Sequence, residues 1–133
     1  MSDTNQKGDI GEAAFVLAAT IKRYWTAKMP QDCPYDYVLD RKDGKILRVQ
    51  VKYRTLPESG SIKIKLIQDS FSNRQNYTVD NIDAIGIFVM EMNKVFLVPV
   101  EDVVGVNEIT MRCVPPKNNQ TEKVRMINQY EQW

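Results

Sequence analysis

Four polar residues in the first half of the chain have the types that metal-dependent chemistry needs: Glu12, Asp36, Gln50 and Lys52. Carboxylate and amide oxygens are hard ligands that suit Mg²⁺, which keeps several waters and takes one or two carboxylates plus a substrate phosphate. A lysine beside such a metal can orient the attacking water or stabilise the developing charge. If these side chains meet, they suit the attack of water on a phosphoryl group.

The elements that would position these residues can be predicted from hydrophobic periodicity. Residues 6–25 have the spacing of one apolar helical face, which would carry Glu12 on the same helix; that face is Ile10, Ala13, Ala14, Leu17, Ile21 and Tyr24. Residues 35–40 and 46–54 predict a β-hairpin with Asp43 and Gly44 at its tip. Side chains alternate along a strand, so Gln50 and Lys52 share one face, and the hairpin brings Asp36 alongside them.

The remaining pattern predicts more strands than helices. We expect a third strand at residues 61–67, a polar loop or short helix at 68–81, and a strand pair at 84–90 and 95–100 joined by a tight turn. A short strand at 109–114 and a weakly helical tail complete the chain. At 133 residues it should form one α/β domain with a mixed sheet.

Composition excludes several classes of enzyme. The chain has no histidine, so it has neither a Ser-His-Asp nor a Cys-His site and no histidine-bound metal. Two cysteines 80 positions apart predict free thiols in a reducing compartment. No apolar run is long enough to span a membrane and no secretion signal is visible, so we expect a cytoplasmic protein that does not contact membranes.

Charge is distributed unevenly although the net charge is only +1. Residues 41–65 hold eight Lys and Arg against two Asp and Glu, whereas residues 80–108 hold one Lys against six Asp and Glu. The basic middle segment fits either a polyanion partner or a solvated sheet face. Each candidate site residue also has a plain structural interpretation: Glu12 as a surface helix residue, Asp36 as a turn cap, and Gln50 with Lys52 as an exposed edge.

Several segments resemble a known family. The order of a helical Glu12, Asp36 within Pro34-Tyr35-Asp36, and Gln50-Val51-Lys52 is similar to the PD-(D/E)XK nucleases. Within that superfamily, the chain resembles the homing endonucleases encoded by cyanobacterial group I introns, in these segments: 7–13, 47–52, 95–100 and 115–120. The resemblance implies a restriction-endonuclease-like core with an N-terminal helix, a β-hairpin, further strands and flanking helices, all in one domain, 1–133.

The resemblance also implies roles for individual residues. Asp36 would be the main ligand of Mg²⁺ or Mn²⁺, with the Val51 carbonyl and the Gln50 side-chain oxygen beside it. Glu12 would hold the metal directly or through water, and Lys52 would position the attacking water. The products would carry a 5′ phosphate and a 3′ hydroxyl. Gln50 departs from the Asp or Glu common in the family, although glutamine is the expected form in the homing branch.

For partners, the resemblance implies double-stranded DNA and a homo-oligomer, with a tetramer favoured over a dimer. The candidate DNA-binding residues continue the basic face and the polar segment after it: Arg48, Arg54, Ser61, Lys63, Lys65, Arg74 and Gln75. The function expected is a site-specific homing-type endonuclease that depends on magnesium. A Holliday-junction resolvase or a restriction-type nuclease of the same fold remains open, as does a DNA-binding module whose nuclease site has decayed.

Overall fold

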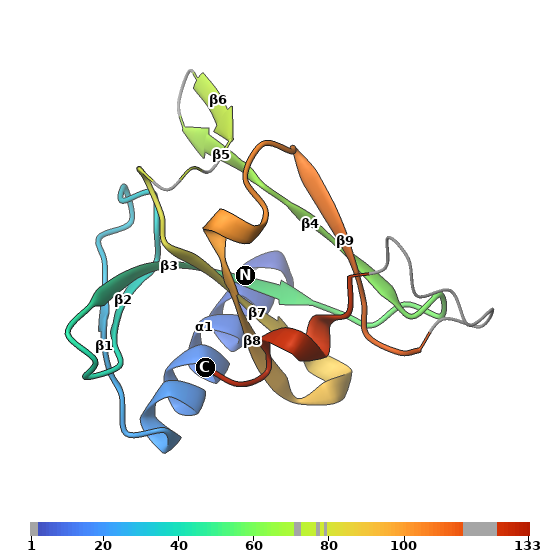
Figure 1. Ribbon diagram of the computed structural model, residues 1–133, viewed down its shortest axis with the longest axis horizontal. Coiled ribbons are helices and arrows are strands. Elements are labelled where there is room, and N and C mark those ends of the chain that lie inside the picture. The colour runs from blue at the N-terminus through green and yellow to red at the C-terminus, as the bar shows by residue number, and fades with distance from the viewer. Residues whose placement is uncertain (1–2, 71–72, 77, 79, 116–124) are drawn as a thin grey trace.

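A computed structural model of the chain describes residues 3–70, 73–76, 78, 80–115 and 125–133. A mixed five-stranded sheet forms its centre, in the order β1-β2-β3-β7-β8 (Figure 1). Its strands are β1 (Trp25–Lys28), β2 (Tyr37–Asp40), β3 (Ile46–Arg54), β7 (Ala84–Val89) and β8 (Lys94–Pro99). Only the β3–β7 pair is parallel, and the other three pairs are antiparallel. The predicted α/β class with a mixed sheet is therefore confirmed.

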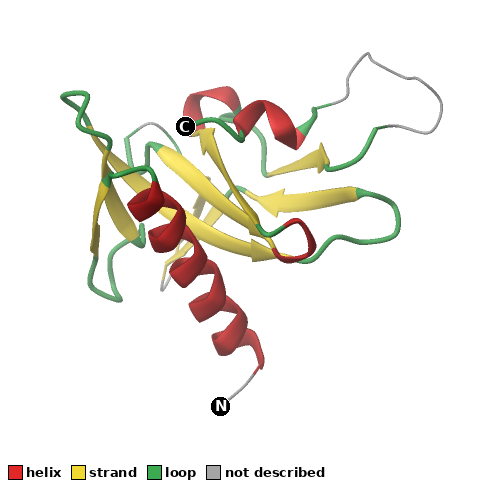
Figure 2. Ribbon diagram, turned by 90° about the horizontal axis from the view of Figure 1, so that it is seen from below, coloured by secondary structure: helices red, strands yellow, loops and turns green. Residues whose placement is uncertain are grey.

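Two layers cover this sheet. One face packs against helix α1 (Asp3–Ile21), which Figure 2 shows crossing the sheet diagonally. The other face packs against a two-stranded sheet of β4 (Ser61–Lys65) and β9 (Glu108–Arg112) and against the 3₁₀ helix Ile127–Tyr130. Every residue of β7 is buried, because this strand has neighbours on both sides and a layer on each face.

The hairpin and the later strand pair follow their sequence patterns. Residues 37–40 and 46–49 pair as β2 and β3, and β7 pairs with β8 through a short 3₁₀ turn, Met90–Met92. A second 3₁₀ helix, Val100–Asp102, follows β8. The polar segment differs from the prediction of a loop or short helix, because β5 (Ile67–Ser70) and β6 (Asn73–Asn76) form a small antiparallel hairpin. These strands were not expected because the segment lacks alternating apolar residues, yet two polar strands can pair through their backbone groups alone.

The apolar face predicted for the first helix is not the face that the helix buries. Ile10, Leu17 and Ile21 are 41%, 61% and 70% exposed, and the helix ends at Ile21 rather than at residue 25. The buried face is instead Gly11, Phe15 and Ala19, which recur every fourth residue. After the helix, Arg23 turns the chain with a φ of 69° and residues 25–28 enter β1.

The inner face of α1 lies very close to the sheet because two glycines lack a side chain there. A Cβ on Gly11 would lie 3.3 Å from the Cβ of Tyr53 in β3. A Cβ on Gly86 in β7 would lie 3.2 Å from the ring of Phe15. The C-terminal Trp133 completes this layer, since its ring stacks on Phe15 and its indole N–H donates to the Val95 carbonyl at 3.0 Å.

None of the helices that the structure describes is both long enough and apolar enough to cross a bilayer.

The close approach at Gly11 gives a prediction with a matched control on the same helix. Gly8→Ala should stabilise the fold by about 1 kcal/mol, because Gly8 has no atom within 4 Å of an added Cβ and alanine favours a helix. Gly11→Ala should lose this gain, because its Cβ meets the backbone and Cβ of Tyr53. Urea unfolding of both variants measures the difference. Equal stabilisation by the two alanines would show that α1 does not sit this close to β3.

Candidate active site

Asp36 lies at the open edge of β3, directly before β2 begins. The Asp36 N–H donates to the Val49 carbonyl at 2.9 Å, although Tyr37 is the residue directly opposite Val49. Asp36 and Tyr37 thus both lie opposite Val49, which is the pairing of a β-bulge. The bulge redirects the side chain of Asp36. The Asp36 carboxylate turns along β3, where its Oδ2 accepts the Val51 N–H at 2.8 Å.

The second half of β3 has a free edge beside this carboxylate. β2 pairs only with residues 46–49, so residues 50–54 pair with β7 on one side and with none of the described strands on the other. The N–H and C=O of one strand residue point to the same side. The Val51 carbonyl therefore faces the edge where its N–H meets Asp36, and a cation held by Asp36 would also find this oxygen.

Glu12 reaches the same region from α1. It follows Gly11, whose contact with Tyr53 brings this turn of the helix against β3. Its carboxylate Oε1 lies 3.3 Å from Nζ of Lys28, and the Glu12 side chain is 24% exposed. Lys28 comes from β1 and was missed at the level of sequence, because it belongs to no motif and the strand that carries it was not predicted.

Gln50 and Lys52 lie on β3 on the face opposite to Val49 and Val51, as the alternation predicts. Both side chains are half-buried, and their neighbours across the parallel pair are Ile85 and Ile87. Lys52 is close enough for its charge to act on Asp36. Glu12 therefore approaches from the helix face of the sheet, Gln50 and Lys52 belong to the other face, and Asp36 lies at the edge between them.

Burial raises the pKa of Asp36 above its usual value of 3.8, and the nearby carboxylate of Glu12 raises it further. The Val51 N–H, Lys52 and Lys28 each act in the opposite direction, but burial is the largest effect. The Glu12 and Asp36 carboxylates thus lie close enough to act on each other, and the charges of Lys28 and Lys52 oppose that repulsion.

The donor set fits a metal that retains much of its water. Within the described parts of the chain, no three Asp, Glu, Cys or His side chains come together as a metal site. Two carboxylates with the Val51 carbonyl match the few protein ligands that Mg²⁺ takes when a substrate phosphate completes its shell.

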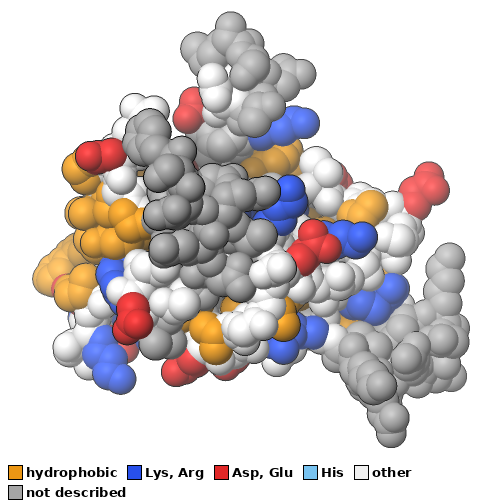
Figure 3. Space-filling view, turned by 90° about the horizontal axis from the view of Figure 1, so that it is seen from above, with side chains coloured by type: hydrophobic (Ala, Val, Ile, Leu, Met, Phe, Trp, Pro, Cys, Tyr) orange, Lys and Arg blue, Asp and Glu red, His pale blue; other side chains and the backbone are white. Residues whose placement is uncertain are grey.

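The candidate DNA-binding residues fall into two groups. Lys63 and Lys65 are exposed on β4, so their ammonium groups can reach a ligand. In Figure 3, Lys and Arg side chains (blue) occur at several places on the right, the side where β4 and β9 lie in Figure 1. Ser61 begins β4, and its hydroxyl accepts a hydrogen bond from Arg112 at 3.1 Å. Arg74 and Gln75 are in β6, but their side chains lie outside the described part of the chain.

Arg48 and Arg54 have contacts within the protein. Arg48 Nε donates to Asp83 Oδ2 at 2.9 Å and Nη1 donates to the Asp80 carbonyl at 2.7 Å. Arg54 Nε donates to the Lys63 carbonyl at 3.0 Å, which ties β3 to β4, and burial lowers its pKa. Arg54 therefore holds β3 against β4, whereas the charge of Arg48 is paired with that of Asp83.

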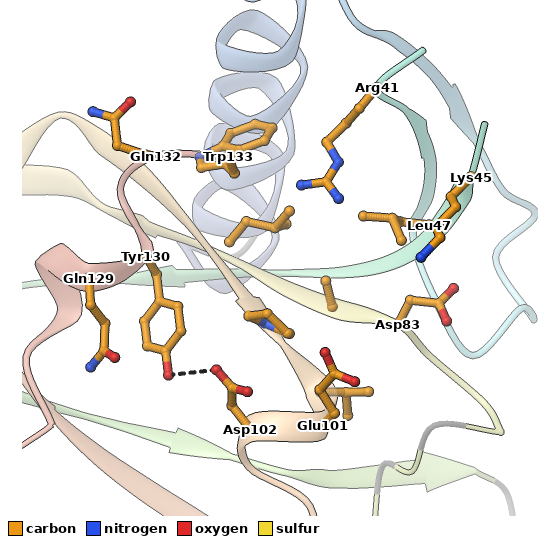
Figure 4. A pocket seen from close by; sticks show the side chains of 14 residues that line it. Arg41, Lys45, Leu47, Asp83, Glu101, Asp102, Gln129, Tyr130, Gln132 and Trp133 are labelled. Carbon is orange, nitrogen blue, oxygen red and sulfur yellow. Dashed lines mark hydrogen bonds between the residues drawn. The ribbon is translucent and has the colours of Figure 1, made fainter. Parts of the chain in front are cut away.

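A hollow of about 630 Å³ lies apart from these residues, between the β2–β3 turn and the C-terminus. Figure 4 shows Asp83, Glu101 and Asp102 around it, and the Tyr130 hydroxyl donates to Asp102 at 3.1 Å. None of Glu12, Asp36, Gln50 and Lys52 lines this hollow. This hollow is thus distinct from the carboxylate site at the edge of β3.

Comparisons with known proteins bear on the family and on the fold of the chain. A family model described as PD-(D/E)XK endonuclease matches residues 2–133. A solved structure entitled as that of a bacterial homing endonuclease, I-Ssp6803I, superimposes with a TM-score of 0.69 at 21% identity, covering 91% of this chain and 86% of that one. No curated protein matches the chain. The structural likeness confirms a restriction-endonuclease-like fold.

The electrostatics of Asp36 can be measured directly by a carbon-13 NMR titration of the side-chain carboxyls. The Asp36 midpoint should lie above 3.8, and Glu12→Gln should lower it, because the substitution removes a like charge. Asp83 is the internal control, since Arg48 holds its pKa below 3.8 and Glu12 is not among the causes. Because only the ionised form binds a cation, protons should displace metal at a higher pH than from an ordinary aspartate. An Asp36 midpoint at or below 3.8 would contradict this arrangement.

Proposed function

Because this chain belongs to the PD-(D/E)XK endonuclease family, we propose that it is a site-specific, homing-type endonuclease that hydrolyses phosphodiester bonds in double-stranded DNA. Membership of the family makes it a nuclease, and DNA is the substrate that the fold implies. The observation that carries the hydrolytic part of this proposal is the Asp36 carboxylate bonded to the Val51 N–H at the open edge of β3. The likeness to a bacterial homing endonuclease supports the homing type. Residues 1–133 would act as one endonuclease domain.

The proposed cofactor is Mg²⁺, or Mn²⁺ in its place. Asp36 would hold it as the main ligand, with the Val51 carbonyl at the same edge, Glu12 directly or through water, and the amide oxygen of Gln50. When bound, such a metal polarises the phosphoryl oxygen and lowers the pKa of its water. The neutral Gln50 weakens this donor set relative to a carboxylate, so one metal is favoured over two.

Lys52 is the proposed catalytic lysine. Its ammonium group acts electrostatically on Asp36, so it lies near the place where a phosphate would meet the site. There it would orient the attacking water and stabilise the charge that develops on the phosphoryl oxygens. Hydrolysis of the phosphodiester bond by this route would leave a 5′ phosphate and a 3′ hydroxyl.

Lys63 and Lys65 are proposed to contact the phosphates of the duplex, since both are exposed on β4. Duplex cleavage needs two active sites, one for each strand, so we also propose a homo-oligomer, with a tetramer favoured over a dimer. A branched substrate would instead indicate a resolvase, and a short palindromic site a restriction-type enzyme.

Substitution of the two central residues tests the catalytic assignment. Asp36→Asn and Lys52→Ala should each lower cleavage of duplex DNA by about 10²-fold or more, because one removes the metal ligand and the other removes the charge beside it. DNA binding without metal, followed by fluorescence anisotropy, should change little. Asp40→Asn and Lys45→Ala, on the same hairpin, are the matched controls and should cleave normally.

The same experiment separates the nuclease from a decayed binding module, the alternative that Gln50 favours. A wild-type protein that binds duplex and four-way-junction DNA but cuts neither with Mg²⁺ nor with Mn²⁺ would support the decayed module. Cleavage that survives in Lys52→Ala would instead move the chemistry to other residues.

The role of β4 is tested by the salt dependence of binding. Lys63→Ala should weaken binding to all DNA sequences about equally and reduce the slope of log K against log salt by about one phosphate contact. Lys94→Ala is a suitable control, because that lysine pairs with Glu131 at 2.8 Å, away from β4. Loss of preference at a single base pair would assign Lys63 to base recognition instead.

A further inference from the structure

The outer face of α1 is an apolar stripe exposed to solvent. It consists of Ile10, Ala13, Leu17 and Ile21, which recur at intervals of three and four residues and so lie in one row along the helix. Leu17 and Ile21 are 61% and 70% exposed, and no charged residue interrupts the row. Since Gly11, Phe15 and Ala19 fill the inner face, α1 is apolar on both sides.

From Ala13 to Ala19 the helix has only apolar residues, and a helix segment of this kind is normally buried on all sides. Figure 2 shows α1 on the outside of the molecule, with no described element across its outer face. At its C-terminal end the stripe continues into an open hollow of about 650 Å³ that includes Ile21, Tyr24 and Trp25. Continuous exposed apolar surface of this kind marks a contact with another macromolecule.

We propose that this stripe docks against the same stripe of a second copy of the chain, with the two helices antiparallel about a two-fold axis. An apolar, uncharged row cannot bind the phosphates of DNA, which require cations. The small Ala13 lies in the middle of the helix and allows two backbones to approach closely, while Ile10 of one copy meets the hollow beside Ile21 of the other.

Charge complementarity selects the antiparallel direction. Asp9 near the start of α1 and Arg23 just after its end are both exposed and carry opposite charges at opposite ends of the stripe. An antiparallel pair related by a two-fold axis places Asp9 of each copy near Arg23 of the other. A parallel pair would place Asp9 against Asp9 and Arg23 against Arg23, which is repulsive.

The inference rests on the proposed function, because cutting both strands of a duplex needs two copies, and it names the surface that joins them. The two layers of the fold make this compatible with DNA binding. α1 covers one face of the central sheet, whereas β4 with Lys63 and Lys65 belongs to the layer on the other face. Docking through α1 therefore leaves the basic strand open and fixes the helix that carries Glu12.

The first test measures solution mass by analytical ultracentrifugation, without DNA and without metal. Wild type should be an oligomer, and Leu17→Glu should halve its mass by weakening self-association more than about tenfold, because it sets two carboxylates against each other. Val106→Glu places the same charge on an exposed apolar residue away from α1 and should leave the mass unchanged. A monomeric wild type, or a Leu17→Glu protein of unchanged mass, would overturn the proposal.

The second test is specific to the antiparallel geometry and does not depend on folding of the Leu17→Glu protein. Asp9→Arg and Arg23→Asp should each weaken self-association. The double variant should restore it, because residue 9 is then positive and residue 23 negative in both copies, so that opposite charges meet again. Failure of the double variant to recover would rule out this pairing. Because mass is measured without DNA or metal, these results are independent of whether Asp36 and Lys52 cleave DNA.

Discussion

The hydrogen bond from the Val51 N–H to the Asp36 carboxylate is the interaction on which the candidate active site depends. It exists because β2 begins only at Tyr37, opposite Val49, while β3 continues to Arg54, so that Val51 has no strand partner on that side among the described strands. An unpaired backbone donor at a half-buried edge needs an acceptor, and Asp36 supplies it. The same bond holds the carboxylate at the edge that the Val51 carbonyl also faces, and burial raises the pKa of Asp36.

The rest of the fold keeps that edge in place while leaving it open. The buried strand β7 fixes β3 from the other side, and α1 lies close enough to β3 for Glu12 to act on Asp36 only because residue 11 is glycine. The two layers present chemically different surfaces to solvent. The layer with β4 carries exposed lysines suited to phosphates, and the layer with α1 carries an apolar row suited to a second copy.

Local patterns predicted the parts of the fold that depend on local physics. The alternation in residues 46–54 and the turn at Asp43 and Gly44 specified the hairpin, which places Asp36 beside the strand that carries Gln50 and Lys52. The roles of Glu12, Asp36, Gln50 and Lys52 rest on the family resemblance and stay a prediction. The buried face of α1 could not be predicted, because both faces are apolar and only the sheet decides that Phe15 rather than Leu17 turns inward. Lys28, the internal contacts of Arg54 and the β5–β6 pair depend on neighbours distant in sequence, which periodicity does not report.

The most direct measurement is anomalous X-ray diffraction from crystals of the protein grown with Mn²⁺ and a DNA duplex. A manganese peak between the Asp36 carboxylate and the Val51 carbonyl, lost in crystals of Asp36→Asn, is the result that this geometry predicts. A manganese ion bound elsewhere in the chain, or an empty edge of β3 in crystals where the duplex is bound, would contradict the assignment of this edge as the active site.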